Sequence, residues 1–132
     1  MSFDIWLDCF RNGDKDLFPT SIVKEAFAAS HIGDDGNYWA LQFPDGGSCR
    51  VRITDEPMTA GFAINRPSGN GLYDAIYEIM RKTQTVLSWS FGGAAAANPS
   101  VIQHMPPEMI KSVGMPRIVH SGDDIIKAIE SS

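Results

Sequence analysis

The chain has 132 residues, a length that predicts a single globular domain spanning residues 1–132. Hydrophobic residues make up 43% of the sequence and charged residues 20%, which excludes an intrinsically disordered chain. No apolar run approaches the roughly 20 residues that a membrane helix needs. The formal net charge of −5 argues against nucleic acid as a direct partner, because basic side chains supply most of the affinity for phosphates.

The acidic excess lies in the first half of the chain. The first sixty residues carry ten acidic and five basic side chains, whereas the remainder carries six of each. Asp4 and Asp8 stand where a secretory signal would carry positive charge, so we expect a cytoplasmic protein. Cys9 and Cys49 lie in apolar, strand-like patterns and are expected to be buried thiols without a disulfide.

The first expected elements are a strand, a turn and a helix. In the segment SFDIWLDCF, one face of the strand holds Phe3, Ile5, Leu7 and Cys9, and the other holds Asp4, Trp6, Asp8 and Phe10. The turn RNGDKD follows. Pro19 then suits the first turn of a helix, whose buried stripe is formed by Ile22, Val23, Ala26 and Phe27.

Three strands are expected after this helix. HIGDDGN is a polar break, which predicts a loop at residues 31–36. NYWALQF and SCRVRIT each alternate between apolar and polar residues, and the Asp-Gly turn in the intervening PDGG predicts a hairpin. GFAIN is expected to add a third strand after a loop at residues 55–60.

The second half of the chain begins with a clearly amphipathic helix. In INRPSGNGLYDAIYEIM, residues 64–80, a strand end leads through a glycine-rich loop into the helix, which is expected to bury Leu72, Ile76, Ile79 and Met80. TVLSWSF then predicts a strand, and the small residues of GGAAAA predict a loop.

Short helices and one short strand are expected to complete the chain. Asn98 and Pro99 form the cap and first turn of one helix, and PPEMIKSVG forms a second helix that ends at Gly114. PRIVH predicts a short strand. In SGDDIIKAIE, Ser121 as cap and Asp124 three residues later predict a closing helix.

The expected order of elements is β-α-β-β-β-α-β-α-β-α, without an internal repeat. It predicts an α+β fold: a mixed, mostly antiparallel sheet of about five to six strands with helices packed on it.

The glycine-rich loop before the amphipathic helix is also a candidate phosphate site. A phosphate-binding loop of the Walker type needs Lys and then Ser or Thr after its last glycine, but Gly71 is followed by Leu72 and Tyr73. A dinucleotide fingerprint needs three glycines, and only Gly69 and Gly71 are present. We therefore favour a turn capped by Asn70, and anion binding by this loop stays open.

The segment SWSFGG is the best candidate for catalysis. Ser90 precedes Gly92 by two residues, as in the nucleophile elbow of hydrolases, with His120 and Asp123 as candidate base and orienting group. That elbow belongs to a large parallel sheet, for which this chain is too short. A serine on the solvent face of a strand is the favoured interpretation, and a small cytosolic hydrolase using Ser90 and His120 stays as the alternative function.

No metal site or cofactor is expected. His31, His104 and His120 are scattered along the chain, and the two cysteines are far apart in sequence. The acids of DDGN lack the spacing of a calcium loop.

A cluster of acids is the remaining candidate site. If the three central strands form an up-and-down meander, loops 31–36 and 55–60 lie at the same end of the sheet. Four acids would then converge there: Asp34, Asp35, Asp55 and Glu56. This is either ordinary solvated loop charge or a surface that faces a basic partner.

Three aromatic residues lie off the expected core stripes. They are Trp6, Tyr38 and Tyr73. Aromatic side chains of this kind serve as anchors at protein interfaces, and the alternative for each is partial burial under a helix.

Four segments carry a resemblance to a known class of proteins: SFDIWLDCF, the FP before the first helix, NRPSGNGLYDAIYEIM and TVLSW. Together they resemble small, single-domain bacterial proteins that are similar to immunity proteins of contact-dependent or polymorphic toxin systems. The resemblance implies a cognate toxin as partner, blocked without catalysis. A basic nuclease would suit the acidic charge. A homo-oligomeric structural module is a third possibility.

Overall fold

The computed structural model describes residues 3–132, and its largest sheet is built around the N-terminal strand. The sheet has the order β11-β10-β9-β1-β2, and β8 pairs with β1 on the side away from β9. β10 and β11 pair in parallel and the other pairs are antiparallel, so the sheet confirms the predicted α+β class. Its strands are β1 (Asp4–Arg11), β2 (Asp14–Lys15), β8 (Gly61–Asn65), β9 (Thr85–Trp89), β10 (Ala94–Ala96) and β11 (Arg117–Ile118).

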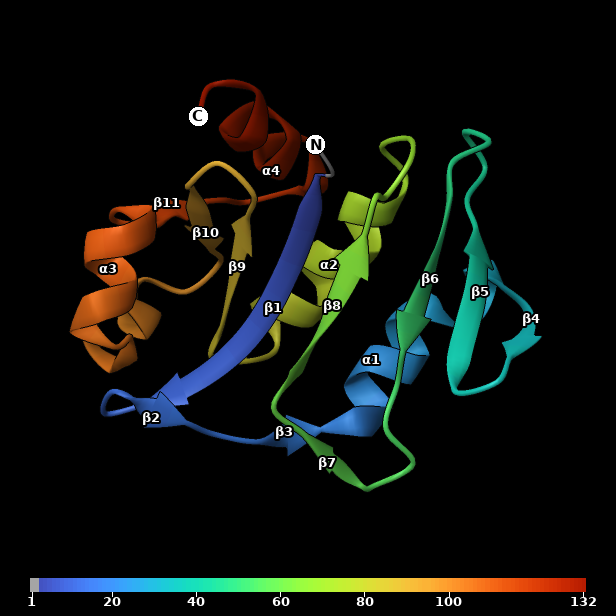
Figure 1. The fold of residues 1–132 in the computed structure, drawn as a ribbon, viewed down its shortest axis with the longest axis horizontal. Coiled ribbons are helices and arrows are strands. Elements are labelled where there is room, and N and C mark those ends of the chain that lie inside the picture. The colour runs from blue at the N-terminus through green and yellow to red at the C-terminus, as the bar shows by residue number, and fades with distance from the viewer. Residues whose placement is uncertain (1–2) are drawn as a thin grey trace.

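A second, three-stranded sheet lies beside β8, with β6 nearest to it (Figure 1). It consists of β4 (His31–Asp35), β5 (Tyr38–Gln42) and β6 (Ser48–Arg52) in antiparallel order. A small pair, β3 (Phe18–Pro19) and β7 (Met58–Thr59), joins the ends of the two larger sheets.

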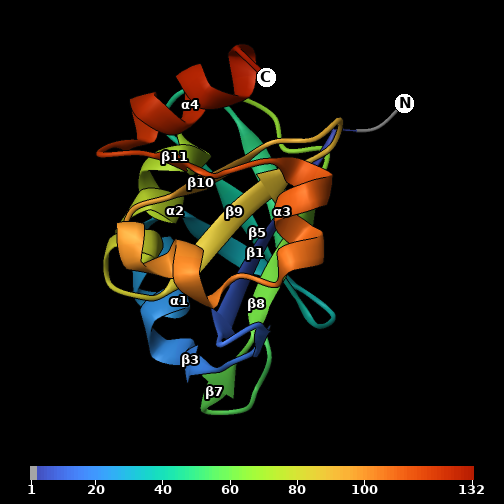
Figure 2. The ribbon, with the colours of Figure 1, turned by 90° about the vertical axis from the view of Figure 1, so that its left-hand side faces the viewer.

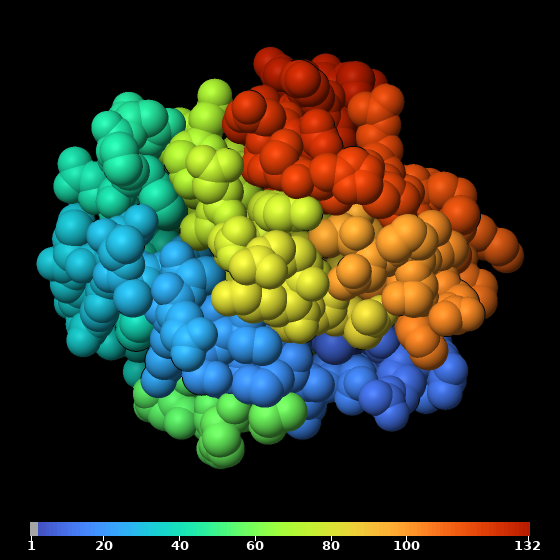
Figure 3. All heavy atoms as spheres, turned by 180° about the vertical axis from the view of Figure 1, so that it is seen from behind, coloured from blue at the N-terminus to red at the C-terminus, as the bar shows by residue number. Residues whose placement is uncertain are grey.

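Helices cover the main sheet on both faces. α1 (Thr20–Phe27), α2 (Leu72–Arg81) and α4 (Gly122–Glu130) lie on the side that Figure 3 shows, and the short η1 (Ala28–Ser30) continues α1. η2 (Pro99–His104) and α3 (Pro107–Val113) cover the other face over β9 and β10, and Figure 2 shows α3 across the sheet from α1 and α2. Among residues 3–132, no helix is long and apolar enough to cross a membrane.

The apolar residues form two clusters, one on each face of the main sheet. The larger contains Ile5 and Leu7 of β1 together with the predicted stripe of α2, which is fully buried at Leu72, Ile76, Ile79 and Met80. The smaller cluster lies under η2 and α3 and includes Phe10, Val86, Ala94, Ala96, Val101 and Met105. Phe10 was expected on the mixed face of its strand, and this second cluster is what buries it.

Several local predictions are confirmed. β5 and β6 form the predicted hairpin, whose turn is closed by the bond from the Gly46 N–H to the Phe43 carbonyl. Ser121 caps α4 by accepting a hydrogen bond from the Asp124 N–H at 3.1 Å, and α3 ends at Gly114 as expected.

Two predictions about the central strands are wrong. Residues 31–35 are not a loop but strand β4, which pairs with β5 through a turn at Gly36, where φ is 63°. β8 does not extend the hairpin as a third strand, because it pairs along its length with β1. The apolar side chains Phe62 and Ile64 match Leu7 and Ile5 in that register, which places them on the face covered by α1 and α2.

Two further corrections concern small residues. Ala94–Ala96 are not a loop but strand β10, buried on both faces between the two apolar clusters. Asn70 does not cap α2. The N-cap is Gly71, without a side-chain cap bond, and the backbone N–H groups of both residues bond the carboxylate of Asp45.

Candidate partner-binding site

An open hollow of about 900 Å³ lies where the second sheet meets β8, and we call it the β6–β8 hollow. One wall is the turn between β4 and β5 together with β6 and the segment after it. The other wall is formed by β7 and β8. Its charged lining residues are Asp34, Arg50, Arg52, Asp55 and Glu56.

Charge in the hollow is partly paired and partly available. The Arg50 guanidinium bonds the Asp35 carboxylate, and its Cζ lies 5.4 Å from the centroid of the Tyr38 ring. Within the described part of the chain, Arg52, Asp55 and Glu56 make no ion pair. Each of these three side chains is exposed, so each can meet a partner's charge without first breaking an internal bond.

His31 joins strand β4 to strand β5 beside the hollow. The His31 ring stacks on the Trp39 ring with centroids 3.9 Å apart, and His31 Nε2 lies 2.7 Å from Asp34 Oδ1. Because His31 lies at the start of β4 and Trp39 on β5, this contact fixes the exposed edge strand against its neighbour.

The structure brings together most of the predicted site residues. Asp34, Asp55, Glu56 and Tyr38 all line the hollow, and Asp35 reaches it through its bond to Arg50. The acids therefore converge although residues 31–35 form a strand, because Gly36 places the tip of the β4–β5 hairpin beside the segment after β6.

The three predicted aromatic anchors have different outcomes. Tyr38 is 40% exposed in the hollow, whereas Trp6 lies on β1, 39% exposed, and is not part of the lining. Trp6 pairs in register with Ala63, a lining residue of β8, so it lies one strand away from the hollow. Tyr73 is buried in the larger cluster, as its alternative interpretation expects.

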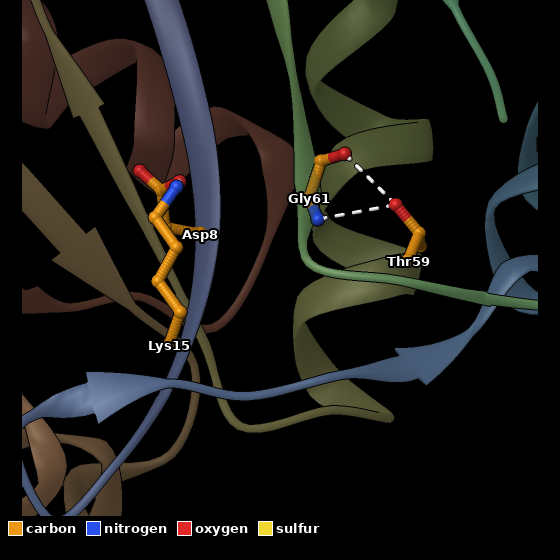
Figure 4. A network of polar contacts seen from close by, with 4 residues as sticks. All are labelled: Asp8, Lys15, Thr59 and Gly61. Atoms are coloured by element: carbon orange, nitrogen blue, oxygen red, sulfur yellow. Dashed lines mark hydrogen bonds and ion pairs between the residues drawn. The ribbon is translucent and has the colours of Figure 1, made fainter.

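Sequence reasoning missed the two arginines and the polar residues of the other wall. Arg50 and Arg52 alternate with buried Val51 along β6, so the pattern of SCRVRIT already placed them on the exposed face. Thr59 could not be found in this way. Its hydroxyl accepts a hydrogen bond from the Gly61 N–H at 3.2 Å and donates one to the Gly61 carbonyl at 3.0 Å (Figure 4).

A half-buried carboxylate lies next to this wall on β1. Asp8 pairs in register with Gly61 and lies 3.8 Å from the Lys15 Nζ (Figure 4). Burial raises the pKa of Asp8, although Lys15 acts in the opposite direction.

The glycine-rich loop before α2 is occupied by a carboxylate of the protein itself. Asp45, in the β5–β6 turn, accepts hydrogen bonds from the N–H groups of Asn70 at 2.7 Å, Gly47 at 2.9 Å and Gly71 at 3.0 Å. These bonds lower the pKa of Asp45, the one from Asn70 most. The N–H groups that could bind a phosphate thus bind Asp45 and join the hairpin to α2.

The contacts of Ser90 do not resemble those of an activated nucleophile. Its hydroxyl accepts from the Asp4 N–H at 2.9 Å and donates to the Asp4 carbonyl at 3.3 Å, which ties β1 to the end of β9. Along residues 3–132, no hydrogen bond joins Ser90 to the ring of His120.

Metal-binding and thiol groups add no further site among residues 3–132. Within the described residues, no group of three or more His, Cys, Asp or Glu side chains is placed to hold a metal ion. Cys9 and Cys49 are both free thiols, and burial raises the pKa of Cys49 to about 11, so this thiol stays protonated at neutral pH.

Comparison of the chain with protein-family models, curated proteins and solved structures finds no match.

Proposed function

We propose that this protein is an immunity-type inhibitor that acts in the bacterial cytoplasm. It binds a cognate toxin domain around the β6–β8 hollow and blocks the toxin without catalysis. One observation carries the proposal: the hollow presents three charged side chains that form no ion pair among residues 3–132, Arg52, Asp55 and Glu56, beside the half-exposed ring of Tyr38. Interfaces of high affinity combine such an aromatic anchor with charges that pair only on binding.

The charge balance supports a basic partner such as a nuclease. Around the hollow, the four acids Asp34, Asp35, Asp55 and Glu56 face two arginines, which leaves two net negative charges. The whole chain is acidic as well, at −5. An acidic surface speeds the encounter with a basic protein.

The hydrolase alternative has less support. A serine nucleophile needs a base that takes its proton, and the Ser90 proton is directed to a backbone carbonyl. No observation singles out a second catalytic group, so we propose binding alone.

A co-expression experiment tests the proposal. The toxin domain encoded beside this gene is induced in a host with and without this protein, and the purified pair is titrated by calorimetry. We expect rescue of growth, one-to-one binding, and about tenfold weaker binding for Asp55→Lys and for Glu56→Lys.

Glu130→Lys serves as the matched control, because it makes the same change of charge on α4, away from the hollow. Toxicity without rescue and without binding would remove the proposed function. Equal weakening by Glu130→Lys would move the interface away from the hollow.

A further inference from the structure

One side of the small ribbon formed by β3 and β7 exposes apolar side chains. Pro19 pairs in register with Met58, and Phe18 pairs with Thr59. Because successive side chains of a strand point to opposite sides, Phe18 is buried in the larger cluster, while Pro19 and Met58 lie on the outer side and are exposed. Leu17 is two residues from Pro19 and shares this outer side. We call the surface formed by Leu17, Pro19 and Met58 the ribbon face.

The ribbon face brings large exposed apolar side chains next to one another. Leu17 is 54% exposed and Met58 is 41% exposed, and the register of Pro19 with Met58 places these two side chains at diagonal positions on neighbouring strands. A single exposed apolar residue is ordinary, whereas adjoining ones mark a surface that a partner covers. In Figure 1 the ribbon crosses the ends of β8 and β6, so its outer side continues the surface around the hollow.

Hydrogen bonds fix the backbone that joins the ribbon face to the acids of the hollow. The Thr20 N–H bonds the Pro57 carbonyl at 2.9 Å, and the hydroxyl of the buried Thr20 donates to the Glu56 carbonyl at 2.7 Å. The Glu56 N–H in turn bonds the Thr54 hydroxyl at 3.2 Å. Glu56 lies only two residues before Met58, so an acid and an apolar side chain are held on one preorganised piece of chain.

The charge that directly precedes β7 is negative and available. Asp55 and Glu56 are exposed and form no ion pair within the described part of the chain. The basic side chains of the turn before β3 are already paired: Arg11 with Asp16 at 3.2 Å, and Lys15 with Asp8 at 3.8 Å. A partner that covers the ribbon face is therefore expected to bring basic side chains to Asp55 and Glu56.

We infer that the ribbon face is the apolar centre of the contact with the toxin domain, and that it receives an apolar side chain of that domain flanked by lysine or arginine. This inference rests on the proposed function, since it names the chemistry of the partner surface. Strong interfaces concentrate their affinity in a few apolar anchors surrounded by residues that exclude water. The flexible side chain of Met58 can adapt its shape to such an anchor.

Replacement of the exposed apolar side chains by serine tests the inference. The toxin domain encoded beside this gene is titrated by calorimetry against the wild type, Met58→Ser and Leu17→Ser. Met115→Ser is the matched control, because it removes the same side chain as Met58→Ser at a position that is 61% exposed and follows α3. Met58→Leu is a second control, because it keeps an apolar side chain of similar size.

We expect about tenfold weaker binding for Met58→Ser and for Leu17→Ser, and nearly wild-type binding for Met58→Leu and Met115→Ser. Equal binding by Met58→Ser and Met115→Ser overturns the inference and keeps the inhibitor, whose contact then lies elsewhere. If Met58→Ser does not fold, the comparison of Leu17→Ser with Met115→Ser decides in the same way.

A peptide probe separates the two proposals if the toxin domain neither binds nor is blocked, a result that removes the proposed function. A short amphipathic peptide of leucine and lysine then replaces the toxin domain, with a leucine–glutamate peptide as its charge control. Binding of the lysine peptide alone, lost in Met58→Ser and kept in Met115→Ser, supports the ribbon face as a site for a basic apolar partner. Absent binding, or equal binding of both peptides, removes the ribbon face as well. A wild-type dimer that Met58→Ser converts to a monomer would identify a second copy of this chain as the occupant and overturn the inference.

Discussion

The carboxylate of Asp45 joins the β5–β6 turn to the loop before α2. A substitution at this residue is therefore a direct test of what these hydrogen bonds contribute to stability. The carboxylate accepts hydrogen bonds from the N–H groups of Asn70, Gly47 and Gly71. We expect Asp45→Asn to lower the melting temperature by a few degrees at pH 7, because a neutral amide oxygen is a weaker acceptor than a carboxylate. Asp55→Asn, whose carboxylate accepts no hydrogen bond among the described contacts, should leave it unchanged.

The same residue predicts a dependence on pH. Hydrogen bonds lower the pKa of Asp45 in the folded state, so the unfolded chain binds this proton more readily. Its contribution is complete above the unfolded pKa of about 3.9 and is lost as the pH falls through the lower folded value. The difference in melting temperature between the wild type and Asp45→Asn should therefore shrink as the pH falls below the unfolded pKa, and a constant difference would contradict this cause.

At the scale of the strand, the close approach of β8 to β1 depends on a glycine. A Cβ on Gly61 would lie 1.8 Å from the Leu7 carbonyl oxygen. The backbone φ of Gly61 is 141°, a conformation that is strained for any residue with a side chain. Gly61→Ala should reduce the free energy of unfolding by about 2–3 kcal/mol. Gly33→Ala, where a Cβ meets nothing within 4 Å, should change it by less than about 0.5 kcal/mol, as urea unfolding can measure.

Elements with a strong local pattern could be predicted from the sequence, and elements defined by distant partners could not. α2 and the β5–β6 hairpin carry their own periodicity and turn residues, and both are confirmed. β4 is almost wholly exposed and lacks an apolar alternation, so its pattern did not indicate a strand. The Asp-Gly turn that follows it, like the Asp-Gly turn between β5 and β6, is nevertheless typical of a hairpin. The partner of β8 depends on tertiary packing against β1, which local pattern does not reveal.

At the scale of the whole molecule, the candidate site depends on how two sheets meet. The convergence of Asp34, Asp55 and Glu56 was predicted from the order of strands, but the pairing of Arg50 with Asp35 was not. Charges of opposite sign lie far apart in the sequence and meet only after folding. The hollow is therefore of mixed charge, where the sequence indicated an acidic patch.

Whole-molecule charge and local charge can be separated by kinetics. Asp55→Lys with Glu56→Lys changes the net charge at the hollow, and Asp123→Lys with Glu130→Lys makes the same change on α4. If the toxin domain binds as proposed, both double variants should associate with it more slowly than the wild type at low salt. Electrostatic steering of the partner depends on the field of the whole molecule. Stopped-flow measurements should show this difference from wild type shrinking toward 1 M salt, where the Debye length is about 3 Å.

Dissociation should respond to the hollow alone. Asp55 and Glu56 would contact the partner directly, so their reversal should speed dissociation by about tenfold, whereas the pair on α4 should leave it unchanged. The local effect should also persist in high salt, because contacts desolvated on binding are screened less than exposed charges. Equal dissociation rates for the two double variants would show that the acids act only through the long-range field, and that the hollow is not where the partner is held.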